Sequence, residues 1–358
     1  MQPMITLVTF PVDYGSVTLQ NNFLAMLKGR AQVKHHVFSP REAPGQGPAL
    51  SRLRRILYRL QQMPELRRVC HTARTEQRTL LFQQISPALF ALPFLRGARA
   101  YIVADWNRKL YEPITGARIS PTWLTRLHAW LFTSVTGIIT YTAAAQRSFI
   151  NDYGVPPERV HRIKMPFDVC GTVPAPHRAN SPLRILFVGG DFYRKGGDAL
   201  VRWFRAHQGP AVELTIMTQS QVELPPGIRL VRNDPSLSAK DLLQEYDLFV
   251  LPTRYDAFPL AIGEAASAGL AVVTTINALG ASEVIEPGLN GEIVRDEEDL
   301  FFRLDELAAD RQRVERYKAH SRMKMQAQFA YAHVFAELRT IICSTSSCGM
   351  EADPLAER

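Results

Sequence analysis

The sequence predicts an α/β protein made of two domains. Its 358 residues are too many for one ordinary hydrophobic core and suit two domains of about 150–200 residues each. In the second half of the chain, apolar strand-like runs alternate with helical segments, which is the pattern of βαβ units in a parallel sheet. Residues 169–182 contain prolines and glycine but few periodic apolar positions, and this composition indicates a linker.

The first half is expected to form a domain over residues 1–168. Apolar runs predict strands at 5–10, 32–38, 100–104, 137–141 and 159–165. Helical periodicity predicts helices at 18–28, 123–132 and 143–153, and 11–16 is expected to be a loop. Ligands of parallel sheets bind beyond the carboxyl ends of the strands, so the loops that follow these strands are the places to search for a site.

The second half gives the clearer succession of elements. Strands are predicted at 183–189, 212–218, 228–233, 248–252, 271–275 and 283–285. Helices are predicted at 197–207, 239–246 and 259–268, and from Glu297 onward. We expect this domain to cover 183–325, with a helix over 326–342 that packs back on the first domain and a disordered tail over 343–358.

The composition is that of an ordinary globular protein. Hydrophobic residues make up 46% of the chain and charged residues 21%, and no apolar run is long enough to span a membrane. The N-terminus lacks the basic and apolar regions of a signal peptide. The four cysteines show no zinc-ligand spacing, so we expect reduced thiols in a cytoplasmic protein; they are Cys70, Cys170, Cys343 and Cys348.

The positive charge of the chain favours anionic partners. The net charge is +8, and residues 52–78 hold eight arginines against Glu65 and Glu76. Apolar residues recur at helical spacing there, which predicts a basic amphipathic helix able to dock at the anionic inner face of the plasma membrane. The alternatives are a solvated arginine-rich face and a surface that attracts an anionic acceptor. No nucleic-acid-binding module accompanies the charge, so nucleic acid is not expected as a partner.

A glycine-rich loop follows the strand predicted at 183–189. Glycines at the strand end let a ligand approach the backbone, and two cations precede a helix whose free N–H groups favour an anion. An arginine can hold phosphate with two hydrogen bonds, while a lysine acts as a point charge. The loop therefore predicts a diphosphate site, with an ordinary turn as the alternative; its residues are Gly189, Gly190, Arg194 and Lys195.

A second candidate motif follows the strand predicted at 248–252. Asp256 lies in the loop, and Glu264 lies within a helix of otherwise small apolar residues. A buried carboxylate needs hydrogen-bond donors, which the hydroxyls of a ribose or hexose can supply. The first amides of the predicted helix would face an anion at its start; they belong to Phe258, Leu260 and Ala261. A capped helix with an exposed glutamate is the alternative.

These motifs resemble those of the family 4 retaining glycosyltransferases, which have the GT-B fold of two Rossmann-like domains. The cationic loop is followed about 60 residues later by Asp256-x7-Glu264, similar to the Glu-x7-Glu motif of that family with its first glutamate shortened by one methylene. The stretches 269–275, 281–285 and 288–291 are similar to the family's downstream pattern. The resemblance is strong over 183–294, moderate over 137–168 and weak over 1–136.

The resemblance implies a role for each matched residue. Arg194 and Lys195 would neutralise the diphosphate leaving group, and Asp256 would hold the donor sugar. Glu264 would bind the ribose, and the backbone near Gly189 and Gly190 and the amides at the helix start would bind phosphate.

In the first domain, Ala104-Asp105 matches a His-Asp pair of the family, and Asp105 is the candidate near the donor sugar. Gly15 replaces part of a glycine-rich loop, and the segment 105–112 is a candidate acceptor contact.

The resemblance further implies a hexosyltransferase that retains the anomeric configuration and needs no metal or cofactor. The donor would be a UDP- or GDP-sugar, and the acceptor a glycan or lipid-linked glycan of surface polysaccharide or glycoconjugate synthesis. Two alternatives stay open: a nucleotide-sugar isomerase of the same fold, and a non-catalytic relative that binds nucleotide sugars. A nicotinamide-dependent oxidoreductase is disfavoured because no Gly-x-Gly-x-x-Gly motif follows a strand.

Overall fold

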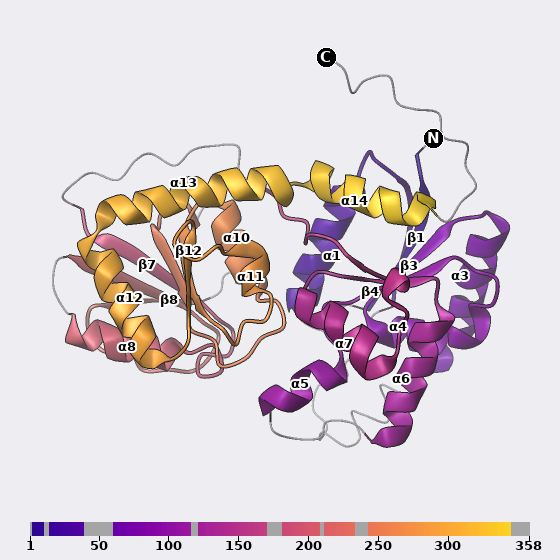
Figure 1. Cartoon of the computed structure of the whole chain (residues 1–358), viewed down its shortest axis with the longest axis horizontal. Coiled ribbons are helices and arrows are strands. Elements are labelled where there is room, and N and C mark those ends of the chain that lie inside the picture. The colour runs from indigo at the N-terminus through magenta and orange to yellow at the C-terminus, as the bar shows by residue number, and fades with distance from the viewer. Residues whose placement is uncertain are drawn as a thin grey trace, which may run out of the picture.

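A computed structural model describes residues 2–10, 14–38, 60–115, 121–169, 181–207, 211–232 and 243–344, with only the backbone at 14–16 and 113–115. Two parallel six-stranded sheets, each flanked by helices, lie side by side (Figure 1). The linker expected at 169–182 and the tail expected at 343–358 fall almost entirely outside the described residues, as does the first part of the basic stretch 52–78.

The sheet of the first domain has the order β2-β1-β3-β4-β5-β6, and every neighbouring pair is parallel. Its strands are β1 (Met4–Thr9), β2 (Gln32–Val37), β3 (Thr79–Gln83), β4 (Ala100–Val103), β5 (Gly137–Thr140) and β6 (Val160–Arg162). Strands β3, β4 and β5 are buried on both faces, as expected for a sheet covered by helices on both sides.

Two groups of helices cover this sheet. Helix α1 (Tyr14–Leu27) packs on one face, where Ile5, Leu81 and Ile139 belong to the same core as Phe23. The opposite core takes in side chains of the helices α3 (Met63–Thr75), α4 (Ile85–Ala91), α6 (Thr122–Ser134) and α7 (Ala143–Tyr153). The remaining elements are α5 (Arg108–Thr115) and the short η1 (Leu92–Phe94) and η2 (Pro157–Arg159).

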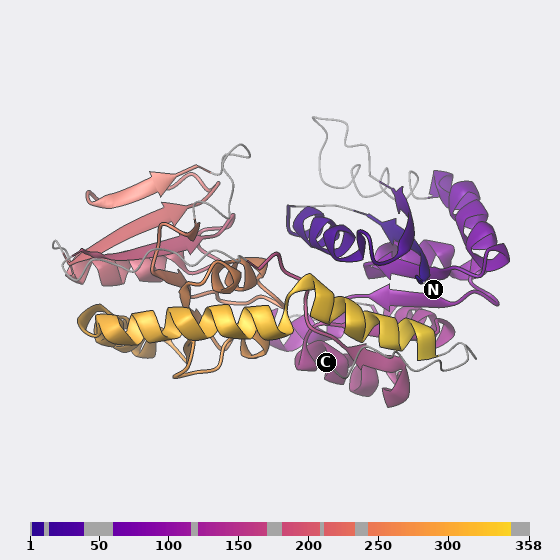
Figure 2. The ribbon, with the colours of Figure 1, turned by 90° about the horizontal axis from the view of Figure 1, so that it is seen from above.

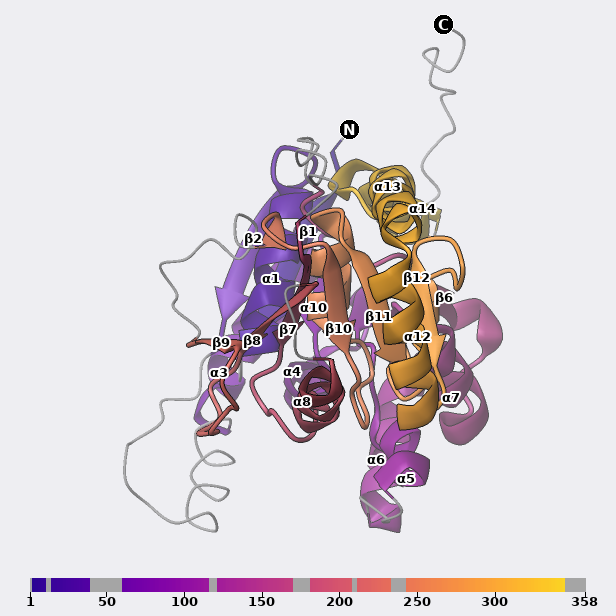
Figure 3. The same cartoon turned by 90° about the vertical axis from the view of Figure 1, so that its left-hand side faces the viewer.

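The sheet of the second domain has the order β12-β11-β10-β7-β8-β9, again parallel throughout (Figure 3). Its strands are β7 (Leu183–Val188), β8 (Val212–Met217), β9 (Ile228–Val231), β10 (Leu248–Leu251), β11 (Ala271–Thr275) and β12 (Gly291–Val294). Its helices are α8 (Gly197–Ala206), α10 (Leu260–Ser267), α11 (Ala281–Val284), α12 (Glu297–Ala309) and α13 (Arg311–Gln328).

The last helix returns to the first domain. Helix α14 (Tyr331–Ser344) follows α13 and contacts α1, so the two helices run along one side of both domains (Figures 1 and 2). At the passage between them, the N–H of Phe167 donates to the carbonyl of Phe329 over 3.1 Å. The ring of Phe167 lies 6.3 Å from that of Phe258, beside α10, so this residue joins the two domains.

Two local predictions were wrong, and two strands were not predicted. The segment 283–285 lies within and just after the helix α11, not in a strand. Helix α1 begins at Tyr14, inside the predicted loop 11–16, because a single glycine is tolerated in a first helical turn. The sequence reading also omitted strands β3 and β12, which are short and buried and carry no alternation of polar and apolar residues.

Candidate active site between the two domains

The loop between β7 and α8 is shaped by its glycines. Gly196 has a φ of +79°, and a Cβ there would lie 2.0 Å from the carbonyl oxygen of Pro252. A Cβ on Gly197 would lie 2.3 Å from the ring of Phe192. Both positions therefore require glycine, and this requirement brings the loop against the end of β10. By contrast, Gly190 has open space where a Cβ would stand.

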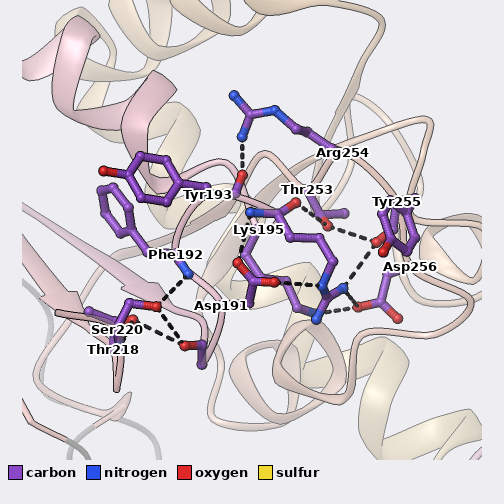
Figure 4. Close-up of polar contacts among 12 residues, drawn as sticks. Asp191, Phe192, Tyr193, Lys195, Thr218, Ser220, Thr253, Arg254, Tyr255 and Asp256 are labelled. Atoms are coloured by element: carbon purple, nitrogen blue, oxygen red, sulfur yellow. Dashed lines mark hydrogen bonds and ion pairs between the residues drawn. The ribbon is translucent and has the colours of Figure 1, made fainter. Parts of the chain in front are cut away.

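Both loop cations converge on one carboxylate. Lys195 Nζ forms an ion pair with Asp256 Oδ2, and Arg194 Nη1 lies 3.7 Å from the same oxygen (Figure 4). The Arg194 guanidinium also donates to the carbonyl of Tyr255 over 3.2 Å and lies 5.4 Å from the centre of that ring. Asp191 accepts from the Arg194 amide over 3.1 Å and from its Nε over 3.3 Å. The cations are thus held in fixed positions at the carboxyl ends of β7 and β10.

The start of α10 lies next to this carboxylate in the chain. Pro259 has an extended backbone before the helix. The amides of Phe258, Leu260 and Ala261 donate to no backbone or side-chain acceptor among the described residues, as is normal for a first helical turn. Such amides form an anion site at the positive end of the helix dipole.

Glu264 is one turn further along α10. Its carboxylate is partly buried and has no hydrogen-bond partner within the described part of the chain. Burial raises its pKa above the ordinary value. A donor such as a ligand hydroxyl would satisfy this carboxylate, which is the chemistry that the sequence predicts for it.

The first domain brings a second carboxylate toward Asp256. Asp105 follows β4, and burial raises its pKa to about 6, with the nearby charge of Asp256 adding to the effect. Tyr111 on α5 lies between the domains, with its ring 6.1 Å from that of Tyr255 in an edge-on contact. Burial raises the pKa of Tyr111, and the charges of Asp256 and Asp105 raise it further.

The structure therefore brings together four of the predicted residues: Arg194, Lys195, Asp256 and Asp105. Gly189 packs against the side chain of Lys195, since a Cβ there would lie 2.9 Å from the Lys195 Cβ. Gly15 lies in the first turn of α1.

Sequence reasoning missed an ion cluster that connects the domains. The Glu283 carboxylate, 6% exposed, accepts from the Ala143 amide over 3.0 Å and from Arg162 over 2.8 Å, and Lys164 Nζ lies 3.4 Å away. Burial alone would raise the pKa of Glu283, but these donors and charges outweigh it and hold the pKa below its usual range. No local signal could have revealed partners that lie more than 100 residues apart.

Neither a metal centre nor a membrane span is found in the described residues. No group of three or more His, Cys, Asp or Glu side chains is placed to hold a metal ion in the ranges given above. Within the same ranges, every helix is too short or too polar to cross a bilayer.

The two-domain fold is shared with solved structures of low sequence identity. The Anabaena protein HepE in complex with UDP matches with a TM-score of 0.72 at 16% identity, covering 95% of this chain and 100% of that one. The lipopolysaccharide outer core galactosyltransferase WaaB, in its apo form, gives 0.71 at 14% identity over 96% and 100%. A glycosyltransferase from Rickettsia africae gives 0.69 at 13% identity over 96% and 100%. The fold is GT-B.

A family model matches the second domain of this GT-B chain. Residues 182–310 match the family described as glycosyl transferases group 1, and they contain the cationic loop, Asp256 and α10. No curated protein matches the sequence significantly. The family match and the fold together support a glycosyltransferase, while the assignment to family 4 stays a prediction.

Proposed function

We propose that this protein is a retaining hexosyltransferase that transfers a sugar from a nucleotide diphosphate to a glycan or a lipid-linked glycan. The observation that carries the proposal is the convergence of Lys195 and Arg194 on Asp256, beside the free amides that begin α10. A UDP-sugar is the favoured donor because HepE was solved with UDP and with UDP-glucose. A GDP-sugar is the second choice to test.

The cations would act on the leaving group. Glycosyl transfer develops negative charge on the departing diphosphate, and cations already in position stabilise that charge without reorganising. In the free protein Asp256 neutralises Lys195. A bound diphosphate would also pair with Lys195. The Asp256 carboxylate would then have oxygen lone pairs free to accept hydrogen bonds from the donor sugar. Glu264 would accept hydrogen bonds from the ribose. These bonds would offset the free-energy cost of burying its carboxylate without a partner.

We infer that the acceptor reaches this site from the first domain, which supplies Asp105. The acceptor would belong to surface polysaccharide or glycoconjugate synthesis in the cytoplasm. Helix α3, which lies in the described part of the basic stretch 52–78, exposes Arg67, Arg68 and Arg74. These residues are suited to an anionic membrane surface, where a lipid-linked acceptor would be found.

Calorimetric titration of the full chain with UDP-, GDP- and ADP-sugars tests the proposal. We expect one nucleotide class to bind and to support transfer or slow hydrolysis of the donor sugar. Loss of binding in Glu264→Gln without a lower melting temperature would assign this carboxylate to the nucleotide. If no nucleotide sugar binds to folded protein at millimolar concentration, the proposed function is wrong.

A further inference from the structure

A tyrosine of the first domain meets a tyrosine of the second beside the candidate site. The ring of Tyr111, on α5, lies 6.1 Å from that of Tyr255, and the two ring planes are nearly perpendicular, at 82°. Tyr255 follows β10 and directly precedes Asp256. Aromatic rings in this geometry attract each other beyond the effect of burial alone. The two tyrosines therefore form an attractive contact across the junction of the domains.

Tyr255 is also the residue against which Arg194 rests. The carbonyl of Tyr255 accepts from Arg194 Nη1 over 3.2 Å, and its ring centre lies 5.4 Å from the guanidinium carbon (Figure 4). The same carbonyl accepts from the Thr253 hydroxyl over 3.2 Å, so this backbone contact is held within the second domain. A guanidinium is attracted to the face of an aromatic ring, and the attraction depends on where that ring lies.

The ring of Tyr255 connects the first domain to Arg194. In the part of the chain that the structure describes, its aromatic and cationic partners are Tyr111 on the first domain and Arg194 on the second. Removing the ring of Tyr111 would leave Tyr255 without an aromatic partner. The Tyr255 ring would then have more freedom to turn away from the guanidinium.

Helix α5 carries Tyr111 as a fixed part of the first domain. Asn107, fully buried, caps its first turn: the side-chain Oδ1 accepts from the Leu110 amide over 2.9 Å and from the Ser148 hydroxyl of α7 over 3.0 Å. The ring of Trp106 lies 6.3 Å from that of Tyr111 and adds a third aromatic group. We therefore expect Tyr111 to move with the first domain rather than independently of it.

Tyr111 has two groups that could act at the site, its ring and its hydroxyl. Burial and the charges of Asp256 and Asp105 raise the pKa of this hydroxyl, while a hydrogen bond with the Ala257 backbone and the charge of Arg194 oppose the rise. The phenol is therefore neutral at physiological pH and already paired with the backbone. A neutral, paired hydroxyl adds no charge to a leaving group, which makes the ring the group that acts.

We propose that Tyr111 is a positioning residue for the transfer reaction: when the domains are closed, its ring holds the ring of Tyr255 against Arg194 and fixes the guanidinium on the leaving diphosphate. The inference rests on the proposed function and adds a means of regulating it. Because Tyr111 belongs to the first domain, Arg194 is fully in place only while the two domains are together. Cleavage of the donor is then favoured in the closed form, which excludes water.

Steady-state kinetics of two Tyr111 variants separates the ring from the hydroxyl. Tyr111→Leu removes the ring, and we expect it to lower kcat about 3- to 10-fold, the size expected for one aromatic pair together with one cation–ring contact. The donor KM should change by less than about 2-fold, since the charge that Arg194 meets develops in the transition state. Tyr111→Phe keeps the ring and should keep most of kcat.

A double-mutant cycle tests whether Tyr111 acts through Arg194. In the Arg194→Ala background, Tyr111→Leu should lower kcat no further, because the group that it positions is gone. Tyr255→Leu should cost as much as Tyr111→Leu, and the two changes together should cost no more than either alone. Tyr255→Leu also keeps the inference testable if the melting temperature shows that Tyr111→Leu does not fold.

Phe302→Leu is the matched control. The guanidinium of Arg303 lies 5.5 Å from the centre of the Phe302 ring, which is a contact of the same kind. Phe302 is 56% exposed on α12, a helix that supplies no residue to the candidate site. This variant should leave kcat and the donor KM unchanged.

Four results would overturn the inference while the wild type still transfers sugar. The first is a wild-type kcat in Tyr111→Leu or, should that variant not fold, in Tyr255→Leu. The second is an equal loss in Tyr111→Phe and Tyr111→Leu, which would assign the effect to the hydroxyl. The third is a loss confined to the donor KM, and the fourth is a pair of losses from Tyr111→Leu and Arg194→Ala that multiply in the double variant. A wild type that binds no nucleotide sugar would instead count against the proposed function.

Discussion

Lys195 is the single residue on which the proposed chemistry depends most. Its side chain is 14% exposed and its ammonium group is paired with Asp256, so its position is fixed before a donor arrives. We expect Lys195→Ala to lower kcat/KM by about 10²-fold or more, by analogy with the loss of one preorganised donor to a developing anion. Steady-state kinetics with the donor found by calorimetry would measure this change.

Arg202→Ala provides the control for that experiment. Arg202 is a cation on α8 whose partners are Asp198 and Glu297, and it is about half exposed. Its loss should leave the rate nearly unchanged. Equal rate losses in the two variants would mean that Lys195 acts only through the overall charge.

Asp105 should make stability depend on pH. Because its pKa in the folded protein is about 6, against an ordinary 3.8, the folded state binds the proton more tightly than the unfolded chain. The free energy of unfolding therefore decreases as the pH rises from about 4 to about 6, and this loss is complete above that range. We expect Asp105→Asn to be more stable than the wild type at pH 8 and equally stable at pH 4, as measured by urea denaturation. A difference of the same size at both pH values would contradict this assignment.

At the scale of the element, the β7–α8 loop depends on Gly196. Alanine there would have to adopt a φ of +79° and would meet the Pro252 carbonyl. We expect Gly196→Ala to lower the free energy of unfolding by more than about 1 kcal/mol and to weaken nucleotide binding. Thermal unfolding and calorimetry would measure the two effects.

Gly190→Ala is the corresponding control for stability, since nothing lies within 4 Å of its Cβ position. Its melting temperature should stay close to that of the wild type. Were Gly190→Ala as unstable as Gly196→Ala, the two glycines would not differ in the way that the structure indicates.

The elements of the second domain were largely predictable, and those of the first were less so. Strand β11 was predicted at its observed bounds, as was α7 in the first domain, because each has a clear apolar pattern and a turn or cap residue at its end. Strand β3 was not predicted because all five of its residues are buried, so its sequence shows no alternation of polar and apolar side chains. Segment 283–285 was misread because three residues with two apolar side chains fit either element.

The part of the candidate site that lies within one domain was predictable from the sequence. The part formed by contacts between the two domains was not. Motifs within the second domain were enough to predict the loop cations, Asp256 and the start of α10. The contact of Tyr111 with Tyr255 and the convergence of Asp105 on Asp256 depend on how two distant segments pack. Spacing along the sequence carries no information about such contacts.

At the scale of the whole molecule, Glu283 should stabilise the contact between domains. It is a buried carboxylate with partners from β6, α7 and the segment after β6. We expect Glu283→Gln to lower the free energy of unfolding by about 1–3 kcal/mol, because the partly exposed cations of Arg162 and Lys164 lose the buried negative charge that they share. Because the pKa of Glu283 is depressed, this contribution should be present at neutral pH and should fade as the pH falls below about 4.5.

Urea denaturation of Glu283→Gln beside Glu297→Gln would measure the difference. Glu297 pairs with Arg202 at the surface, with both side chains more than 40% exposed. Such a pair contributes at most about 1 kcal/mol. If the surface variant lost as much stability as Glu283→Gln, the interdomain cluster would have no special role.

The end of the first domain lies against the point where the chain turns from α13 into α14. Phe167 is hydrogen-bonded to Phe329 and bridged to Ala330, where α13 gives way to α14 (Figure 2). This contact joins the first domain to the α13–α14 junction, so we expect any rotation of one domain against the other to have its axis near Phe167.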